Sequence, residues 1–109
     1  MNILIPKYII KYKILFLYKM EPPLTRAKGK VKYNGHYETW YSQKVLPGKG
    51  LNIPGRHVDG RGLVCDGSGF ICVATTLVPM GATIDTSLGM GKRYDTCPTA
   101  NTVDIYTDW

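Results

Sequence analysis

Several features that would point directly to a function are missing from this sequence of 109 residues. It has only three cysteines and no Cys-x-x-Cys pair, so the close ligand pair usual in zinc sites is absent. The odd count fits no complete disulfide framework, although one bridge with one free thiol is compatible with it. None of the glycine-rich runs at 48–50, 60–62 and 89–91 has the Gly-x-x-x-x-Gly-Lys-Ser/Thr spacing of a phosphate loop. The sequence therefore predicts no metal site and no cofactor.

Long apolar runs are missing as well. Residues 1–20 are apolar but are interrupted by four lysines, whereas a membrane-spanning helix needs about 20 mostly apolar residues. The short run 14–18 lacks the unbroken stretch and the small-residue cleavage site of a signal peptide. Three interpretations stay open for residues 1–19: a basic amphipathic segment that contacts a membrane surface, an extended disordered leader, or an upstream start with true initiation at Met20. We favour the last two over the first.

The body of the chain lacks an excess of positive charge. Residues 1–32 carry eight Lys and Arg against one acidic residue, which gives +7, whereas residues 33–109 carry six against seven, which gives −1. The net charge of +6 therefore belongs to the N-terminal segment. A nucleic-acid-binding domain would be expected to have a basic face of its own, so we predict no nucleic-acid partner.

Helical periodicity and internal repeats are also missing. Twelve Gly, seven Pro and eight Tyr indicate short strands and many turns, so we expect one all-β domain. The consecutive prolines after Glu21 indicate a linker. We place the boundary so that residues 1–28 are a leader and linker and residues 29–109 are the folded domain.

The clearest local pattern is a β-hairpin. The segments Lys30–Tyr33 and His36–Tyr41 flank Asn34-Gly35, which supplies the positive φ angles of a tight turn. Alternation with more polar neighbours predicts that one set of residues is half-buried: Val31, Tyr33, Tyr37, Thr39 and Tyr41.

The remaining strands are expected at 70–75, 82–86, 92–94 and 102–106, which makes about six in all, with turns at 66–69, 79–81 and 88–91. Between the hairpin and these strands lies a glycine- and proline-rich stretch, Pro47–Gly62. A loop of this length in a small domain is often functional.

Two carboxylates, Asp95 and Asp104, stand out because each adjoins or interrupts a short β-rich segment. A carboxylate in an apolar strand is costly to bury unless it is paired, hydrogen-bonded or neutral, and such burial raises its pKa. Raised carboxyl pKa values serve acid catalysis. Two simpler interpretations stay open: Asp95 caps a turn, and Asp104 lies on an exposed strand face.

Four motifs in order resemble the three-aspartate domain, a member of the rare-lipoprotein-A-like double-psi β-barrel family. That family has a Val-Ala-Val-Asp strand, a Pro-x-Gly-Thr turn, an Asp-Thr-Gly motif and a closing Asp-Ile-Tyr. This chain has Val73-Ala74, Pro79-Met80-Gly81-Ala82-Thr83, Asp95-Thr96 and Asp104-Ile105-Tyr106. The resemblance covers about the last forty residues.

The resemblance implies a small six-stranded double-psi β-barrel that cleaves the glycan strands of peptidoglycan in the cell wall or outside the cell. As a lytic transglycosylase, it would use Asp95 first to protonate the glycosidic oxygen and then to accept the proton of the sugar's 6-hydroxyl. That hydroxyl attacks C1 and gives an anhydro sugar, without the second carboxylate nucleophile of ordinary retaining glycosidases. Asp104 would bond to Asp95 or orient sugar hydroxyls.

The chain departs from the family at two places. Thr75 and Thr76 stand where the first of the three aspartates would fall, and Cys97-Pro98 replaces the glycine after Asp-Thr. Glycine allows close approach of a ligand to the backbone, and proline removes a donor. Both changes affect catalysis more than the barrel.

Further candidates for substrate binding are Arg56, His57, Trp40 and Tyr106. His57 lies in the long loop and titrates near neutral pH, although a lone loop histidine is more often simply solvated. Hairpin aromatics such as Trp40 can stack on sugars but more often form cross-strand pairs. Cys97, close to Asp95, could act as a nucleophile, but a buried inert thiol is the commoner case.

Other functions remain open beside cleavage. The same barrel could be a non-catalytic glycan-binding module of the cell wall, as expansin-type proteins show for similar folds, or a structural component of a phage. In each case we expect a monomer.

Overall fold

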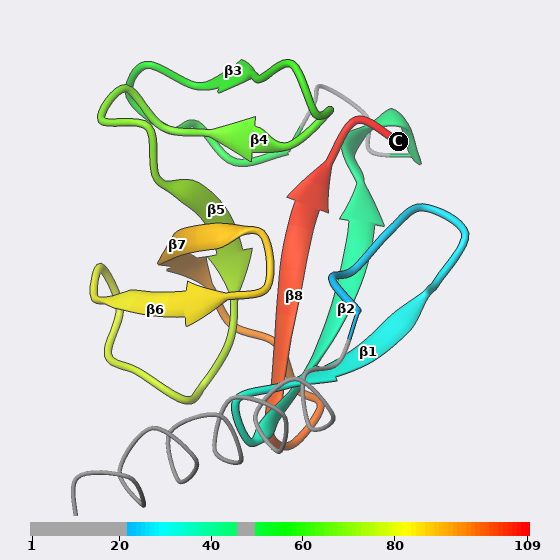
Figure 1. Ribbon diagram of the computed structural model, residues 1–109. Helices are drawn as coiled ribbons and strands as arrows, with labels where there is room; N and C mark the ends of the chain where they lie inside the picture. The colour runs from blue at the N-terminus through cyan, green and yellow to red at the C-terminus, as the bar shows by residue number, and fades with distance from the viewer. Residues whose placement is uncertain (1–21, 46–49) are drawn as a thin grey trace, which may run out of the picture.

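The computed structural model describes residues 22–45 and 50–109, so the leader expected at residues 1–19 lies outside the described part. The described residues form an all-β protein with one eight-stranded sheet (Figure 1), which confirms the predicted fold class. The strands are β1 (Lys30–Tyr33), β2 (His36–Ser42), β3 (His57–Val58), β4 (Val64–Cys65), β5 (Ile71–Ala74), β6 (Thr83–Thr86), β7 (Gly89–Asp95) and β8 (Thr102–Thr107). One short 3₁₀ turn, η1 (Gln43–Val45), follows β2.

Two strands exceed the six expected. They are β3 and β4, each only two residues long, and they pair with each other as an antiparallel ladder. β3 lies inside the glycine-rich stretch that we expected to be a loop. A two-residue strand is too short to show an alternating pattern, so periodicity could not reveal it.

The β1–β2 hairpin forms as predicted, with Tyr33 opposite His36 and positive φ angles of 49° and 85° at Asn34 and Gly35. The predicted half-burial holds for Tyr33 and is wrong for Tyr37 and Tyr41, which are exposed. Tyr37 is 37 % exposed, whereas Glu38 next to it is fully buried. The opposite face of β2 packs inward because its polar groups find hydrogen-bonding partners inside the protein, as described below. A pattern of hydrophobic residues does not reveal such partners.

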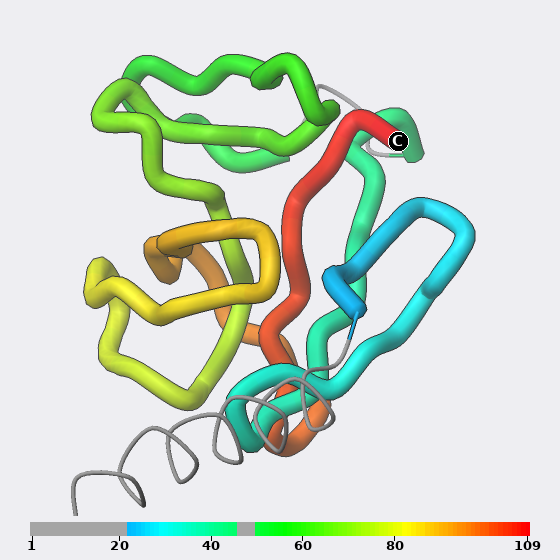
Figure 2. Tube along the Cα trace, viewed as in Figure 1, coloured from blue at the N-terminus to red at the C-terminus, as the bar shows by residue number. Residues whose placement is uncertain are grey.

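The sheet is held together by pairings between strands distant in the sequence. β2 pairs with β8 in parallel, β8 pairs antiparallel with β5, and β5 pairs in parallel with β7. Figures 1 and 2 show β8 running between β2 and β5, with β6 and β7 on the other side of β5 and the β3–β4 pair above. β6 completes that side as the antiparallel partner of β7.

The sheet buries apolar side chains on both faces. The larger cluster contains Leu24, Val31, Leu63, Cys65, Ile71, Val73, Val103 and Ile105. The smaller one contains Ile53, Val64 and Cys72, with Leu51, Tyr94 and Tyr106 against it. Because β5 contributes to both clusters, all four of its residues are buried, which confirms the buried strand expected at 70–75.

The turn between β6 and β7 lies earlier than expected. The sequence predicts a turn at residues 88–91, but the chain turns at Ser87-Leu88 and β7 already begins at Gly89. Gly91 continues the strand because its missing side chain fits beneath Val73, whose Cγ1 would lie only 3.0 Å from an added Cβ. Glycine here reflects close packing rather than a turn. Within residues 22–45 and 50–109, no helix is long and apolar enough to cross a membrane.

Candidate functional site

One transverse row of the sheet carries both aspartates singled out from the sequence. Ala74 of β5 is paired with Asp104 of β8 on one side and with Asp95 of β7 on the other. Neighbouring strands lie about 4.8 Å apart, so the two aspartate Cα atoms are roughly 10 Å apart across β5. All three residues line the same groove. The small side chain of Ala74 keeps the space between the two carboxyl groups open.

A β-bulge in β7 turns Asp95 toward this groove. The register of β5 and β7 shifts between Val73 and Ala74, so that Arg93 opposes Val73, Asp95 opposes Ala74, and Tyr94 is the extra residue. Side chains alternate between the two faces of a strand, and an extra residue reverses that alternation beyond it. Without the bulge, Asp95 would share the face of Arg93. The bulge is therefore what places the two aspartates in one site.

The groove over this row has a volume of about 610 Å³. Its floor and walls come from four strands and two loops: Tyr41, Gly50, Leu51, Asn52, Ala74, Asp95, Thr96, Cys97, Pro98, Asp104 and Tyr106. Tyr41 and Tyr106 are paired in the parallel register of β2 and β8 and supply aromatic surface along one side. A hollow of this size with a few convergent polar groups is typical of a small-molecule or oligomer site.

Asp95 is half-exposed at the groove and its carboxylate accepts two hydrogen bonds. Tyr106 donates its hydroxyl to Oδ2 at 3.0 Å, and the Thr96 backbone N–H donates to Oδ1 at 2.8 Å. Burial and this bond raise the pKa of the Tyr106 hydroxyl, so it stays a donor across the physiological range. The bond to Thr96 is local, as a cap would be, because it joins Asp95 to the next residue of the chain. The Tyr106 bond adds an orientation that a cap does not require.

Asp104, like Asp95, is half-buried. Thr39 donates its hydroxyl to Asp104 Oδ1 at 2.7 Å. Burial raises the pKa of Asp104, and the Thr39 bond acts in the opposite direction without cancelling that rise. No hydrogen bond joins Asp95 and Asp104 among the described residues, so the direct bond between them expected from the sequence is not formed, and Asp95 plays no part in raising the pKa.

A second hollow of about 450 Å³ adjoins the groove, and residues 50–52 line both. Arg56 and His57, expected from the sequence to bind substrate, lie at this second hollow. The Arg56 guanidinium donates to the Leu51 carbonyl at 2.5 Å and to Gln43 Oε1 at 3.0 Å. Arg56 therefore holds the wall between the two hollows. His57 is exposed, and its Nδ1 lies 2.9 Å from the Gly55 carbonyl.

Trp40 is not brought to the groove. It alternates with Thr39 and Tyr41, which face the groove side, and is paired with the core residue Ile105. Its ring packs edge-to-face on Trp109, with 5.4 Å between ring centroids. This is the cross-strand packing that the sequence left open as the commoner case.

A buried carboxylate, Asp66, holds a residue next to Asp95, and the sequence did not indicate it. Asp66 accepts hydrogen bonds from Tyr94 at 2.5 Å and from the backbone of Ser68 and Phe70. Burial alone would raise the pKa of Asp66, but these bonds outweigh it and lower the pKa. The bond fixes Tyr94 beside Asp95. The Asp-Gly-Ser-Gly sequence indicates the turn, but no local signal connects it to a tyrosine 28 residues away.

Thr75 is one of the two threonines that stand where the resemblance would place an aspartate, and it offers no carboxyl group. It is fully buried, and its hydroxyl donates to the Thr102 carbonyl at 2.9 Å. Its backbone N–H donates to the Asp95 carbonyl at 3.1 Å. Thr75 thus connects β5 to the start of β8 and to the end of β7, which is a structural contribution to the site.

The groove offers carboxyl and phenol groups but no cluster suited to a metal. Among the described residues, no group of three or more His, Cys, Asp or Glu is arranged to hold an ion. Cys97 lines the groove as a buried free thiol, and no histidine lines the groove with it. Two carboxyl groups with different surroundings, next to aromatic surface, suit a ligand rich in hydroxyl groups that exchanges a proton with the protein.

Comparison with known proteins finds no matching family model, no matching curated protein and no matching solved structure.

Proposed function

We propose that this chain is a three-aspartate-type double-psi domain that binds a peptidoglycan glycan strand in the groove and cleaves it as a lytic transglycosylase outside the cell or in the cell wall. The observation that carries the proposal is the row Asp104–Ala74–Asp95. It places two carboxyl groups from two different strands, β8 and β7, in one groove. The motifs at Val73-Ala74 and Asp104-Ile105-Tyr106 support the family assignment.

In this proposal Asp95 is the acid and then the base. Its protonated carboxyl group gives a proton to the glycosidic oxygen as the bond from C1 breaks. The resulting carboxylate then accepts the proton of the sugar's 6-hydroxyl while that oxygen forms a bond to C1, which regenerates the acid and leaves an anhydro sugar. Because the substrate supplies the nucleophile, one positioned carboxyl group is sufficient. The Tyr106 hydroxyl holds Asp95 in place for both steps.

Asp104 supports the reaction by binding. Its carboxyl group, whose pKa is raised by burial, lines the groove together with Tyr41 and Tyr106. There it forms hydrogen bonds with sugar hydroxyls, as acceptor or donor. Tyrosine rings offer apolar faces on which sugar rings stack. Arg56 acts indirectly, since it fixes the wall at Leu51.

The test is mass spectrometry of purified peptidoglycan incubated with the full chain. We expect anhydro-muropeptides from the wild type and at least a hundredfold less from Asp95→Asn, the size of effect typical of losing a general acid. Asp85→Asn is the matched control, because Asp85 is exposed on β6 and bonds only to Tyr33 in the described structure. Equal product from Asp95→Asn and Asp85→Asn would overturn the assignment of Asp95.

A non-catalytic glycan-binding module is the second candidate, and a specific observation favours it. Thr75 is one of the two threonines that stand where the family pattern has an aspartate, and its hydroxyl donates to a backbone carbonyl. This groove therefore has one carboxyl group fewer than the family pattern. Sedimentation of the chain with peptidoglycan, without any anhydro product, would favour the module over the enzyme.

A further inference from the structure

The transverse row that carries the two aspartates continues beyond the groove. Asp104 is paired with Thr39 of β2, and Thr39 is paired with Lys30 of β1. The row thus runs Lys30–Thr39–Asp104–Ala74–Asp95 across five strands, roughly 19 Å from end to end at about 4.8 Å per strand. Paired residues share a face of the sheet, so Lys30 and the aspartates lie on the same face.

A second lysine joins Lys30 at this end of the row. Lys32 is paired with Tyr37 in the β1–β2 ladder, and both lysine ammonium groups lie over the Tyr37 ring, at 4.5 Å for Lys30 and 5.8 Å for Lys32. All three side chains are exposed. We call these three residues the lysine pad. Two ammonium groups gathered over one ring repel each other, and an anion placed between them would relieve that repulsion.

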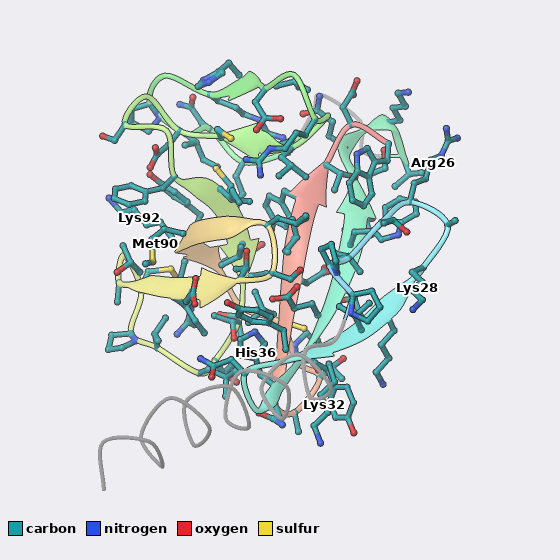
Figure 3. The ribbon with its side chains drawn as sticks, viewed as in Figure 1. Arg26, Lys28, Lys32, His36, Met90 and Lys92 are labelled. Atoms are coloured by element: carbon teal, nitrogen blue, oxygen red, sulfur yellow. The ribbon has the colours of Figure 1, made fainter. Side chains whose placement is uncertain are left out.

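The exposed acidic residue bonded to β1 is Asp85, which accepts the Tyr33 hydroxyl at 2.8 Å. Tyr33 alternates with Lys32, so this bond lies on the face of β1 away from the pad. Neither of the two ion pairs formed among the described residues includes a pad lysine. Arg26 and Lys28 are also exposed and extend outward along the β1 end of the molecule, as Figure 3 shows together with Lys32. In residues 22–45 the acidic residue is Glu38, which is fully buried.

We propose that the lysine pad binds acidic groups, carboxylate or phosphate, carried by the same polymer whose glycan strand occupies the groove. This inference rests on the proposed function, because it extends the glycan site from the aspartates along the row to β1. An anionic polymer lying across the strands would place neutral sugar at Asp95 and Asp104 and charged substituents at Lys30 and Lys32. Repulsion of anions by the two groove carboxylates and their attraction by the pad would fix the register of the polymer.

A simpler explanation for the lysines is protection of an edge. β1 ends the order of the sheet, and lysines on an edge strand discourage pairing with other chains. That explanation predicts no salt-dependent retention on an anionic polymer. Cation–π attraction to the Tyr37 ring accounts for the position of both ammonium groups under either explanation, so the binding experiment is what separates the two.

The test measures retention of the full chain on purified peptidoglycan sacculi by sedimentation, with Asp95→Asn throughout so that the polymer stays intact. Relative to this background, Lys30→Gln/Lys32→Gln should bind about fivefold to tenfold more weakly at low salt, the effect expected for two exposed charge contacts. The difference should shrink as salt is raised. Lys30→Arg/Lys32→Arg, which keeps both charges, and Lys44→Gln, which removes an exposed charge on η1, should bind as the background does.

One treatment of the sacculi distinguishes the source of the anion by its two outcomes. If the effect of Lys30→Gln/Lys32→Gln disappears once phosphodiester-linked wall polymers have been stripped with hydrofluoric acid, the pad binds phosphate. If the effect persists on stripped sacculi, the pad binds the carboxylates of the peptide stems. Both results support the pad, and unchanged thermal unfolding of the variants confirms that they are folded.

Three results would overturn the inference: equal retention of Lys30→Gln/Lys32→Gln and Lys44→Gln, retention that does not depend on salt, or release of the bound chain by a single-stranded oligonucleotide but not by soluble muropeptides. The last would assign the pad to nucleic acid. These outcomes are independent of cleavage. If the wild type released no anhydro products but binding still depended on the pad, the enzyme proposal would be overturned and the pad proposal would stand.

Discussion

Tyr106 connects the two sides of the groove, because it comes from β8 and donates its hydroxyl to Asp95 of β7. We expect Tyr106→Phe to reduce glycan cleavage about threefold to tenfold, since a net hydrogen bond of about 1 kcal/mol no longer orients the carboxylate. Initial rates of anhydro-muropeptide release measure this effect. Binding to peptidoglycan should change much less, because the ring remains.

Tyr41→Phe is the matched control for that substitution. Tyr41 lines the same groove, but its hydroxyl makes no hydrogen bond within the described part of the chain. A cleavage rate reduced equally by both substitutions would show that the Tyr106 hydroxyl contacts the substrate in general and does not act through Asp95.

The raised pKa of Asp104 makes stability depend on pH. The folded state holds the proton of this carboxyl group more tightly than the unfolded chain, whose carboxyl has the ordinary value of 3.8. The stability contributed by the protonated group is therefore complete below that value and is lost as the pH rises through the raised pKa of the folded state. Asp104→Asn keeps an acceptor for Thr39 and does not titrate. We expect its free energy of unfolding, relative to the wild type, to increase from about pH 4 to about pH 7.

Urea denaturation of both proteins across that pH range measures the difference. Ser68→Ala, which replaces an exposed side chain that does not titrate, should show no such trend. A wild type that gains stability over Asp104→Asn with rising pH would show that the Thr39 bond outweighs burial.

At the scale of single residues, three side chains singled out from the sequence, Asp95, Asp104 and Tyr106, line the groove. Trp40, Arg56 and His57 do not. The buried pair Asp66 and Tyr94 was not foreseen, because the two residues contact each other only once β4, β5 and β7 are assembled. A buried carboxylate is recognisable from its partners, and these are not local.

At the scale of elements, the β6–β7 turn is fastened to β2 through Ser87. Glu38 is fully buried on β2, and the Ser87 side chain and backbone N–H donate to its carboxylate at 2.5 and 2.9 Å. The Ser87 hydroxyl also accepts the Leu24 backbone N–H at 3.1 Å. His36 approaches the same carboxylate at 3.2 Å. These contacts explain why this face of β2, and not its tyrosine face, is buried.

Ser87→Ala should therefore destabilise the fold by about 1–3 kcal/mol, because it removes a hydrogen bond to a buried carboxylate and leaves the Leu24 N–H without its acceptor. The free energy of unfolding from urea titration measures this loss. Ser68→Ala is the control, since Ser68 is exposed and its hydroxyl makes no hydrogen bond among the described residues. Comparable losses from both substitutions would contradict the role of Ser87 as a fastener.

The segment leading into β3 lies directly on the turn between β4 and β5. A Cβ added to Gly55 would lie 2.4 Å from the Gly67 Cα, and Gly55 has a φ angle of 70°. We expect Gly55→Ala to cost about 2–4 kcal/mol, because backbone must move and the angle is unfavourable for alanine. Gly29→Ala, where no atom lies within 4 Å, should be close to neutral. Thermal unfolding midpoints compare the two, and equal midpoints would show that this contact yields easily.

The local sequence pattern predicted those elements that depend only on neighbouring residues. The Asn34-Gly35 hairpin and the apolar strand β5 were predicted near their observed bounds. The bulge at Tyr94 was not, because a bulge is defined by the register of a partner strand. Yet it decides which face Asp95 occupies, so the site depends on a feature that pattern cannot supply.

At the scale of the whole molecule, the three cysteines are free and buried, so the bridge that the odd count left open is not formed. Burial raises the pKa of Cys65 to about 11 and that of Cys72 to about 12. Both therefore hold very little thiolate near neutral pH. We expect alkylation of Cys72 in the native protein to require global unfolding, so its rate should follow the urea dependence of unfolding. A rate of Cys72 alkylation that does not change with urea concentration would indicate a local opening of β5.

The overall pairing scheme could not be predicted from the sequence. Both parallel pairings join strands far apart along the chain, with Tyr37 against Thr102 in one of them. Nothing in the composition of β2 or β8 specifies this partner over the adjacent strand. The all-β class follows from short alternating segments, whereas the topology follows from how those segments jointly bury two core clusters.

The central position of β8 bears on how the protein is made. β8 is paired with both β2 and β5, although it comprises residues 102–107 and is translated long after them. While a ribosome is still adding residues before Thr102, the edges of β2 and β5 that later hold β8 have no partner. Pairing of β2 and β5 with β8 must therefore wait until residues 102–107 have been made, and contacts of such sequence separation form slowly. A nascent chain stalled before Thr102 should depend on chaperones that shield those edges.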